Sequence, residues 1–247
     1  MSLTVTATGG NDDYPNLEKG MYEGALYQLV DLGTKEYQFG NEDPKPQRKV
    51  RLTFEITKAL NPEENKILME DGRPFVVSES YTYSLHEKSK LRMHIESWNG
   101  ESLSEEDLTQ GVELESFLGK TAKIEVDHTG PKPDGTGGGK PKIKAIREPA
   151  GGSVKVATKN EQTVFELALY CDEFKGNSSP ETKAMCDVFD NLPQWIQDTI
   201  EESFELKAAK DSDTAPTQTV SAAVASDNLE TISEEGSQGL KDDEIPF

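Results

Sequence analysis

The chain has 247 residues, of which 34% are hydrophobic and 29% are charged, and its formal net charge is −20. This length allows one sizeable domain or two small ones, and the low hydrophobic content predicts that part of the chain is disordered. No signal peptide opens the chain and no stretch reaches the ~18 apolar residues of a membrane span, which predicts a cytoplasmic protein without a membrane partner, in the host cytoplasm if the chain is viral.

The negative charge is distributed unevenly along the chain. Residues 1–160 carry 21 Lys and Arg against 26 Asp and Glu, whereas residues 161–247 carry 5 against 20. Overall acidity argues against nucleic-acid binding. The uneven distribution weakens that argument, because a locally basic face can bind phosphate while an acidic segment stays apart. We therefore expect a basic partner, or association of the acidic end with a basic groove.

The front of the chain predicts an arm followed by two strands. Residues 1–18 are polar and predict a flexible arm, and residues 19–34 predict a long first strand. Glycine and proline between residues 36 and 47 predict a loop. Residues 48–60 form the clearest strand, because Val50 and every second residue to Ile56 are apolar on one face.

The middle of the chain predicts three more strands with helices between them. We expect a strand over 75–85, a helix over 87–98 and a capped short helix beginning at Ser104. Two further strands are expected over 120–128 and 140–148. Five strands with a helical insert after the third follow the order of an OB-fold barrel, which binds oligonucleotides on strands 2 and 3 and on the 1–2 and 4–5 loops. The predicted class is therefore α+β, mainly β, with an OB-fold domain over 19–148.

The acidic part of the chain predicts three segments. Residues 149–207 are expected to form a connector and a small helical appendage, with a helix restarting at Pro193. The sequence leaves open whether these helices pack on the barrel or on a second subunit, so a homo-oligomer is compatible with it. Residues 208–240 are poor in aromatic residues and rich in Ser, Thr, Ala and acids, which predicts a disordered linker. That linker would tether residues 241–247.

The last residues, Asp-Asp-Glu-Ile-Pro-Phe, join three carboxylates to a short apolar end. This composition suits a pocket with an apolar floor and a basic rim. It resembles the C-terminal tip of bacterial single-stranded-DNA-binding proteins, and the rest of the chain is similar to the longer single-stranded-DNA-binding proteins of tailed phages. The resemblance implies that the tip recruits replication and repair proteins and competes with DNA for the binding groove. The residues that it assigns to partner binding are Asp242, Asp243, Glu244, Ile245, Pro246 and Phe247.

The sequence gives little support to catalysis. The three histidines, His86, His94 and His128, lack metal-ligand spacing, and no pair of carboxylates forms a recognisable acid and base motif. We therefore expect that the protein is not an enzyme and that it has no catalytic residue, no cofactor and no metal site.

Binding of single strands has a clearer physical basis, because it needs aromatic rings that stack on bases and cations that follow the backbone. The candidate DNA-binding residues are Tyr37, Phe39, Arg48, Lys49, Arg51, Tyr81, Lys88, Lys90, Arg92, Lys140, Lys142 and Lys144. Tyr83 and Trp98 are weaker candidates for stacking, since their periodicity favours the core. An adaptor that binds proteins, and carries a similar tip without binding DNA, is the alternative function.

Overall fold

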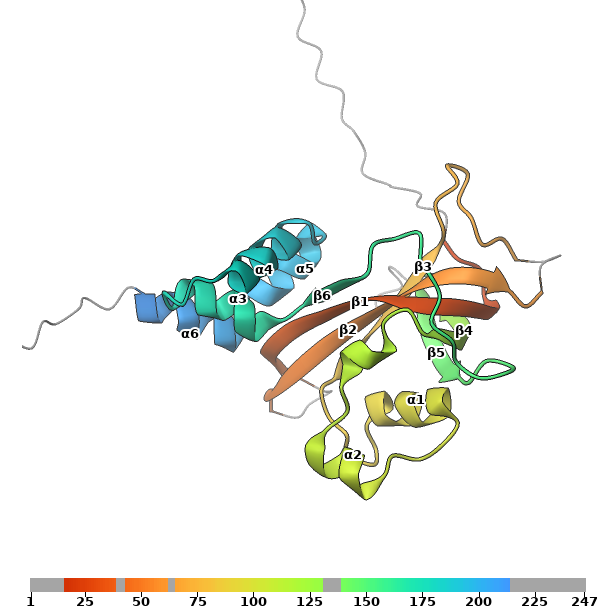
Figure 1. Cartoon of the computed structure of the whole chain (residues 1–247), viewed down its shortest axis with the longest axis horizontal. Coiled ribbons are helices and arrows are strands. Elements are labelled where there is room, and N and C mark those ends of the chain that lie inside the picture. The colour runs from red at the N-terminus through yellow and green to blue at the C-terminus, as the bar shows by residue number, and fades with distance from the viewer. Residues whose placement is uncertain (1–15, 39–42, 62–64, 131–138, 214–247) are drawn as a thin grey trace, which may run out of the picture. The chain divides into compact units, whose positions relative to one another are not determined.

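The computed structural model describes residues 16–38, 43–61, 65–130 and 139–213. All of these residues belong to one compact unit, Met1–Ala215. Its fold is mixed α+β, with an open sheet, largely antiparallel, and helices (Figure 1). Residues 1–15 of the predicted arm over 1–18, most of the predicted linker and the tip over 241–247 lie outside the described residues, so the predictions made for them stay predictions. Residues 16–18 of that arm are described, and Leu17 is buried in the core of the sheet, so the prediction of a flexible arm is wrong there.

Six strands form the sheet: β1 (Gly20–Tyr37), β2 (Lys45–Ala59), β3 (Val76–Thr82), β4 (Thr121–His128), β5 (Pro141–Arg147) and β6 (Thr163–Phe165). The order is β3-β2-β1-β4-β5, and β6 pairs in parallel with the middle of β1. The first five were predicted in this order. The sixth was expected to begin a helix, so the prediction was wrong for β6.

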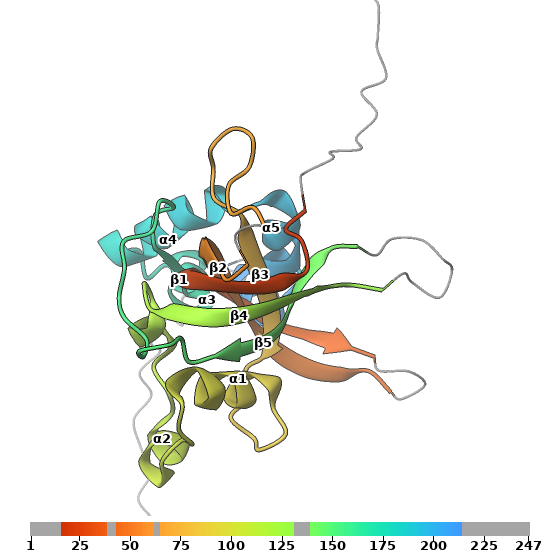
Figure 2. The same ribbon diagram turned by 90° about the vertical axis from the view of Figure 1, so that its right-hand side faces the viewer.

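The sheet is not closed into a barrel by strand pairing. Its edge strands β3 and β5 approach each other, but no pairing between them is found in the described chain. Helix α1 (Lys90–Asn99) lies beside both strands (Figure 2). The Lys90 ammonium contacts Glu79 of β3 at 2.9 Å and donates a hydrogen bond to the main-chain oxygen of Ile143 on β5 at 3.3 Å. A helix thus links the two edges that hydrogen bonds would join in a closed barrel.

The inner face of the sheet holds the larger core. Val50, Leu52, Phe54 and Ile56 of β2 are buried, as their alternation predicts. Trp98 of α1 is 1% exposed and its indole N–H donates to the main-chain oxygen of Thr121 at 2.7 Å. Its assignment to the core is confirmed, because burial of an indole requires such a partner for its N–H.

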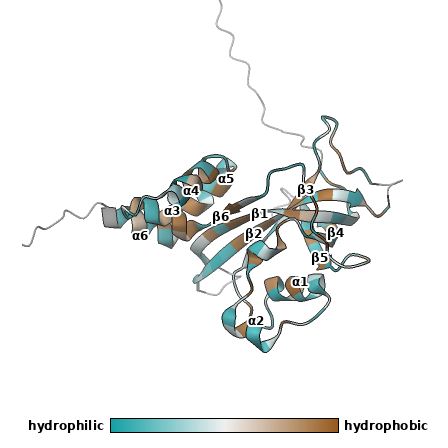
Figure 3. Ribbon diagram, in the orientation of Figure 1, coloured by the Kyte–Doolittle hydropathy of each residue, from teal (hydrophilic) through white to brown (hydrophobic). Residues whose placement is uncertain are grey.

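Two short helices follow α1. Helix α2 (Glu105–Gln110) begins with the predicted capping box, in which Ser104 and Asp107 satisfy each other's main-chain N–H. It buries no residue, and Figure 3 shows it as hydrophilic. A single 3-10 turn, η1 (Leu114–Phe117), leads from there into β4.

The C-terminal helices are α3 (Leu167–Phe174), α4 (Pro180–Asp190), α5 (Gln194–Glu201) and α6 (Phe204–Asp213). They pack on β1 of the same chain and form a second core with Val30 and Leu32, into which β6 contributes Phe165. The helices approach β1 closely at Gly33, where φ is +71° and an added Cβ would lie 2.6 Å from side-chain atoms of Leu167 and Ser203. Helix α6 continues to Asp213, so residues 208–213 are helical and were wrongly assigned to the linker.

The connector between the sheet and these helices is fixed by one buried carboxylate. Glu55 of β2 is 4% exposed and accepts hydrogen bonds from the main-chain N–H groups of Lys159 at 2.9 Å and Asn160 at 2.7 Å. A buried charge is tolerated where several donors satisfy it. No helix in the described ranges is long and apolar enough to cross a membrane.

Candidate nucleic-acid interface

The outward faces of β2 and β3 form a polar, cationic surface. Side chains alternate along a strand, so Lys49 and Arg51 point away from the buried Val50. The antiparallel register pairs Lys49 with Thr82 and Arg51 with Ser80, and paired residues share a face of the sheet. Lys49, Arg51, Ser78, Ser80 and Thr82 are called the β2–β3 face below.

Each cation of this face contacts an aromatic ring. The Lys49 ammonium lies 3.5 Å from the centre of the Tyr37 ring, at the end of β1. The guanidinium carbon of Arg51 lies 4.5 Å from the centre of the Trp195 ring, on α5. Trp195 is 52% exposed, so much of its ring is available to a ligand. Both contacts have cation–π geometry, and they place a ring beside each of two positive charges on β2.

Burial changes the electrostatics of this face. It lowers the pKa of Arg51 to about 10, partly offset by nearby Glu79, and it also lowers the pKa of Lys49. Arg51 therefore stays protonated at neutral pH while it is partly removed from water. Its guanidinium also donates to the hydroxyl of Ser78. Attraction to an anion is stronger for a charge that is poorly solvated, so this arginine is suited to bind phosphate.

Arg48 does not belong to the β2–β3 face. It precedes Lys49 on the strand, so its side chain lies on the opposite face, where its guanidinium pairs with Asp31 and lies 5.1 Å from the centre of the Tyr83 ring. Its pKa is raised, chiefly by the hydrogen bond with Asp31. The pleat therefore separates Arg48 from Lys49 and Arg51, and the predicted role of Arg48 in DNA binding stays a prediction.

Tyr81 is buried and does not present a stacking surface. It is 1% exposed, and its hydroxyl lies 2.9 Å from Nδ1 of His94. Its assignment as a stacking residue is wrong, since strand alternation turns it into the core. Tyr83, which periodicity assigned to the core, lies beyond the end of β3 and is 51% exposed.

The predicted cations around α1 are mostly paired. Lys90 contacts Glu79, and Arg92 contacts Glu96 at 2.9 Å and the main-chain oxygen of Leu85 at 3.2 Å. Lys88 is exposed and forms no ion pair within the described ranges. Only Lys88 of this cluster is thus open to a new anion without breaking a contact.

The cations of β5 face carboxylates of β4. Lys144 and Arg147 both contact Glu125, at 2.6 Å and 3.1 Å. Lys142 pairs across the strands with Asp127, while Lys140 is exposed at the strand's start. This cluster is largely neutralised and is a weaker candidate for phosphate binding than the β2–β3 face.

No pattern in the sequence indicates that Trp195 borders a strand. It falls within an apolar stripe, but Ile196 and Ile200, four residues apart, are the buried pair, and Trp195 lies one position off their face. That offset is the signal that could have identified it as exposed. Phe39, another predicted stacking residue, and the tip over 242–247 lie outside the described residues.

No group of three or more potential metal ligands was found among the described residues. The β2–β3 face can instead bind an extended anion with flat groups, through two cations, three hydroxyls and two rings. Comparison with known proteins identifies no family for the chain. No family model matches it, and neither a curated protein nor a solved structure matches it.

Proposed function

We propose that the chain is a single-stranded-DNA-binding protein that coats and protects single strands without sequence specificity during replication, recombination and repair, in a phage setting. The observation that carries the proposal is that each cation of the β2–β3 face contacts an aromatic ring beside that face, Lys49 with Tyr37 and Arg51 with Trp195. Cations that follow the backbone and rings that stack on bases are the two elements of single-strand binding. The protein would do no chemistry on the DNA.

The strand order also supports the proposal. An OB fold is a five-stranded, partly open barrel that binds oligonucleotides on strands 2 and 3. Here the five strands are ordered β3-β2-β1-β4-β5, and the edge strands β3 and β5 lie beside each other without a pairing between them. We therefore interpret the sheet as an OB-like fold in which α1 replaces that last pairing.

The composition of the face favours single strands over duplex. A base in a duplex has its faces covered by neighbouring pairs, whereas a single-stranded base can stack on a ring for about 1–3 kcal/mol. The hydroxyls of Ser78, Ser80 and Thr82 can donate to phosphate or base edges without favouring one sequence. Neither the rings nor the hydroxyls are therefore expected to distinguish one base from another.

The tip extends the proposal to partner proteins. Its resemblance to bacterial tips supports recruitment of replication and repair proteins by Asp242–Phe247. Its three carboxylates would also compete with DNA for Lys49 and Arg51. Removal of Asp242–Phe247 should leave the fold unchanged and the DNA affinity equal or higher, and a lower affinity would contradict the competition.

The proposal is tested by fluorescence anisotropy of a labelled oligo(dT) of ~30 nucleotides, with a duplex of equal length as control. We expect salt-sensitive binding to the single strand alone. Each lost phosphate contact removes about 0.7 from the slope of log K against log salt for single strands. The double variant Lys49→Ala, Arg51→Ala should therefore lower the slope by about 1.4.

The matched control is Lys66→Ala, Lys183→Ala, which removes two exposed lysines outside the β2–β3 face. It should leave affinity and slope close to those of the unmodified chain. Equal losses in both double variants would reject this face, and no binding by the unmodified chain would favour the adaptor function.

A further inference from the structure

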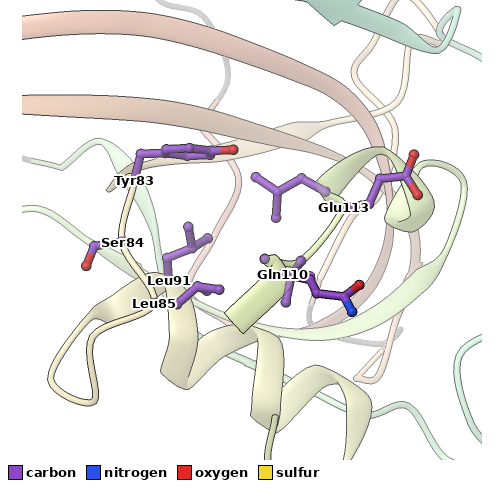
Figure 4. A pocket seen from close by; sticks show the side chains of 9 residues that line it. Tyr83, Ser84, Leu85, Leu91, Gln110 and Glu113 are labelled. Atoms are coloured by element: carbon purple, nitrogen blue, oxygen red, sulfur yellow. The ribbon is translucent and has the colours of Figure 1, made fainter. Parts of the chain in front are cut away.

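A second surface lies on the side of the sheet opposite to the β2–β3 face. A pocket of about 430 Å³ lies between Tyr83 and the segment 110–114, with Leu85 and Leu91 in its floor. Figure 4 shows the Tyr83 ring on one side of this pocket and Glu113 on the other. A second hollow of about 240 Å³ shares Tyr83 and residues 112–114 with the first. The two hollows adjoin at these shared residues and are together called the groove below.

The floor of this groove is apolar. Val112 and Leu114 line both hollows, and Leu29 and Val50 line the second. Tyr83 stands at the rim with half of its surface exposed. An apolar groove with an exposed aromatic ring is the usual form of a site for a short peptide segment.

The rim of the groove is acidic. Glu113, Glu115 and Glu166 line the second hollow beside Arg48, whose charge is paired with Asp31 of the same lining. None of the three glutamates forms an ion pair with a described residue. Burial and the nearby charges of Glu115 and Asp31 raise the pKa of Glu166. The neighbouring carboxylates thus repel one another, and a cation placed between them would relieve that repulsion.

This charge excludes two occupants that the rest of the chain suggests. DNA phosphates would be repelled by the three glutamates, so the groove is not an extension of the β2–β3 face. The tip over 242–247 carries three carboxylates of its own and would be repelled in the same way. A ligand for this groove must bring both positive charge and apolar side chains.

We propose that the groove binds a partner protein through a short segment in which Lys or Arg flanks large apolar side chains. The apolar side chains fill the floor between Tyr83 and Leu114, and the cations contact Glu113, Glu115 and Glu166. This site is separate from the acidic tip and does not depend on DNA binding. The chain would then bind acidic-motif readers through its tip and basic segments through its groove.

The test uses two labelled peptides of equal charge, Gly-Lys-Leu-Lys-Phe-Lys-Gly and the same peptide with Ser in place of Leu and Phe. Anisotropy with the full chain should show binding of the first peptide and at least tenfold weaker binding of the second. Equal affinities would overturn the proposal, because they would mean attraction to the net charge alone.

Protein variants locate the site. One triple variant removes the charges of the rim: Glu113→Gln, Glu115→Gln, Glu166→Gln. It should weaken binding of the apolar peptide at least fivefold. The control triple variant, Glu18→Gln, Glu70→Gln, Glu101→Gln, removes three exposed charges elsewhere and should change the affinity less than twofold. Equal losses in the two triple variants would overturn the proposal.

Tyr83→Asp separates docking from attraction to net charge. It adds a negative charge while removing the ring at the rim, so docking predicts weaker binding and net-charge attraction predicts tighter binding. Phe204→Asp makes the same change at an exposed ring on α6 and should not weaken binding. An unchanged urea midpoint for Tyr83→Asp would show that its fold is intact, and tighter binding by that variant would overturn the proposal.

Discussion

The guanidinium carbon of Arg51 lies 4.5 Å from the centre of the Trp195 ring, so a helix of the acidic region completes a surface of the sheet. Val30, which pairs with Arg51 across the strands, is buried in the core shared with these helices. The helices are therefore one wall of the candidate interface. A chain cut after residue 148 would expose Val30 and Leu32 and lose Trp195, so binding should be measured on the full chain.

Trp195 can report directly on base stacking. The chain has two tryptophans, of which Trp98 is 1% exposed and Trp195 is 52% exposed. Addition of oligo(dT) should quench the intrinsic fluorescence, because a base stacks on the exposed ring. Trp195→Phe should remove most of this quenching while keeping an aromatic ring. Trp195→Ala should weaken binding about tenfold, which lies within the ~1–3 kcal/mol of one stacked base.

The control for Trp195 is Phe204→Ala, which removes another exposed ring of the helical region. Its affinity should stay within twofold of the unmodified chain. Persistent quenching in Trp195→Phe would show that the ring does not meet the DNA.

Neighbouring cations of β2 should differ in their contribution to DNA binding. Lys49→Ala should lower the slope of log K against log salt by about 0.7, the value for one phosphate contact to a single strand. Arg48→Ala should leave the slope unchanged, since Arg48 lies on the other face and already pairs with Asp31. The measurement is the salt titration of each single variant side by side. Equal slopes for the two variants would refute the separation of the two faces.

Hydrophobic periodicity predicted the first five strands and α1, because each presents an apolar face to the core of the sheet. Val50 to Ile56 alternate without interruption and are buried as expected. The same reasoning failed for β6, whose three residues are too short to show a period. It also ended the helices too early, because the buried stripe continues past Leu206 only through the small side chain of Ala209.

The candidate site was predicted only in part. Lys49 and Arg51 follow from alternation along β2, and Tyr37 lies at the end of the strand beside it. Trp195 could not be assigned to the same surface, because its position depends on how α5 packs against β1. Sequence counts also overestimated the free cations, since cross-strand partners such as Glu125 for Lys144 depend on register.

Gly33 should be essential for packing of the helices on β1. Its φ of +71° disfavours any residue with a Cβ, and an added Cβ would lie 2.6 Å from Leu167 and Ser203. Left-handed backbone costs about 1–2 kcal/mol, and overpacking adds typically ~1–3 kcal/mol. Gly33→Ala should therefore lower the free energy of unfolding by about 3 kcal/mol in urea titrations.

Gly72→Ala is a matched control for Gly33→Ala. Gly72 has a φ of +81° with nothing within 4 Å of an added Cβ, so its substitution should cost only the backbone contribution of about 1 kcal/mol. An equal decrease in the free energy of unfolding in the two variants would mean that the helices do not pack closely against Gly33.

His94 should make the fold sensitive to mild acid. Burial, together with the nearby charge of Lys90, lowers the pKa of His94 from 6.5 to about 4, and its ring contacts Tyr81 and the main chain of Lys144. The unfolded chain therefore binds a proton more readily than the folded chain between these values. Stability present above pH 6.5 is lost as the pH falls towards 4, by up to about 3 kcal/mol at 1.36 kcal/mol per unit.

The contribution of His94 is isolated by urea unfolding between pH 7 and pH 4.5. Carboxylates with lowered pKa values, such as Asp127 at about 2, lose their stabilising contribution mainly below their unfolded pKa of about 4, so they contribute little to the loss above pH 4.5. His94→Asn keeps a side-chain partner for the Tyr81 hydroxyl and removes the titrating ring, so its stability should change little over the range even if it is lower at pH 7. His86→Asn, at an exposed histidine, should retain the pH dependence of the unmodified chain. If His94→Asn retained it as well, another group would have to account for the loss in acid.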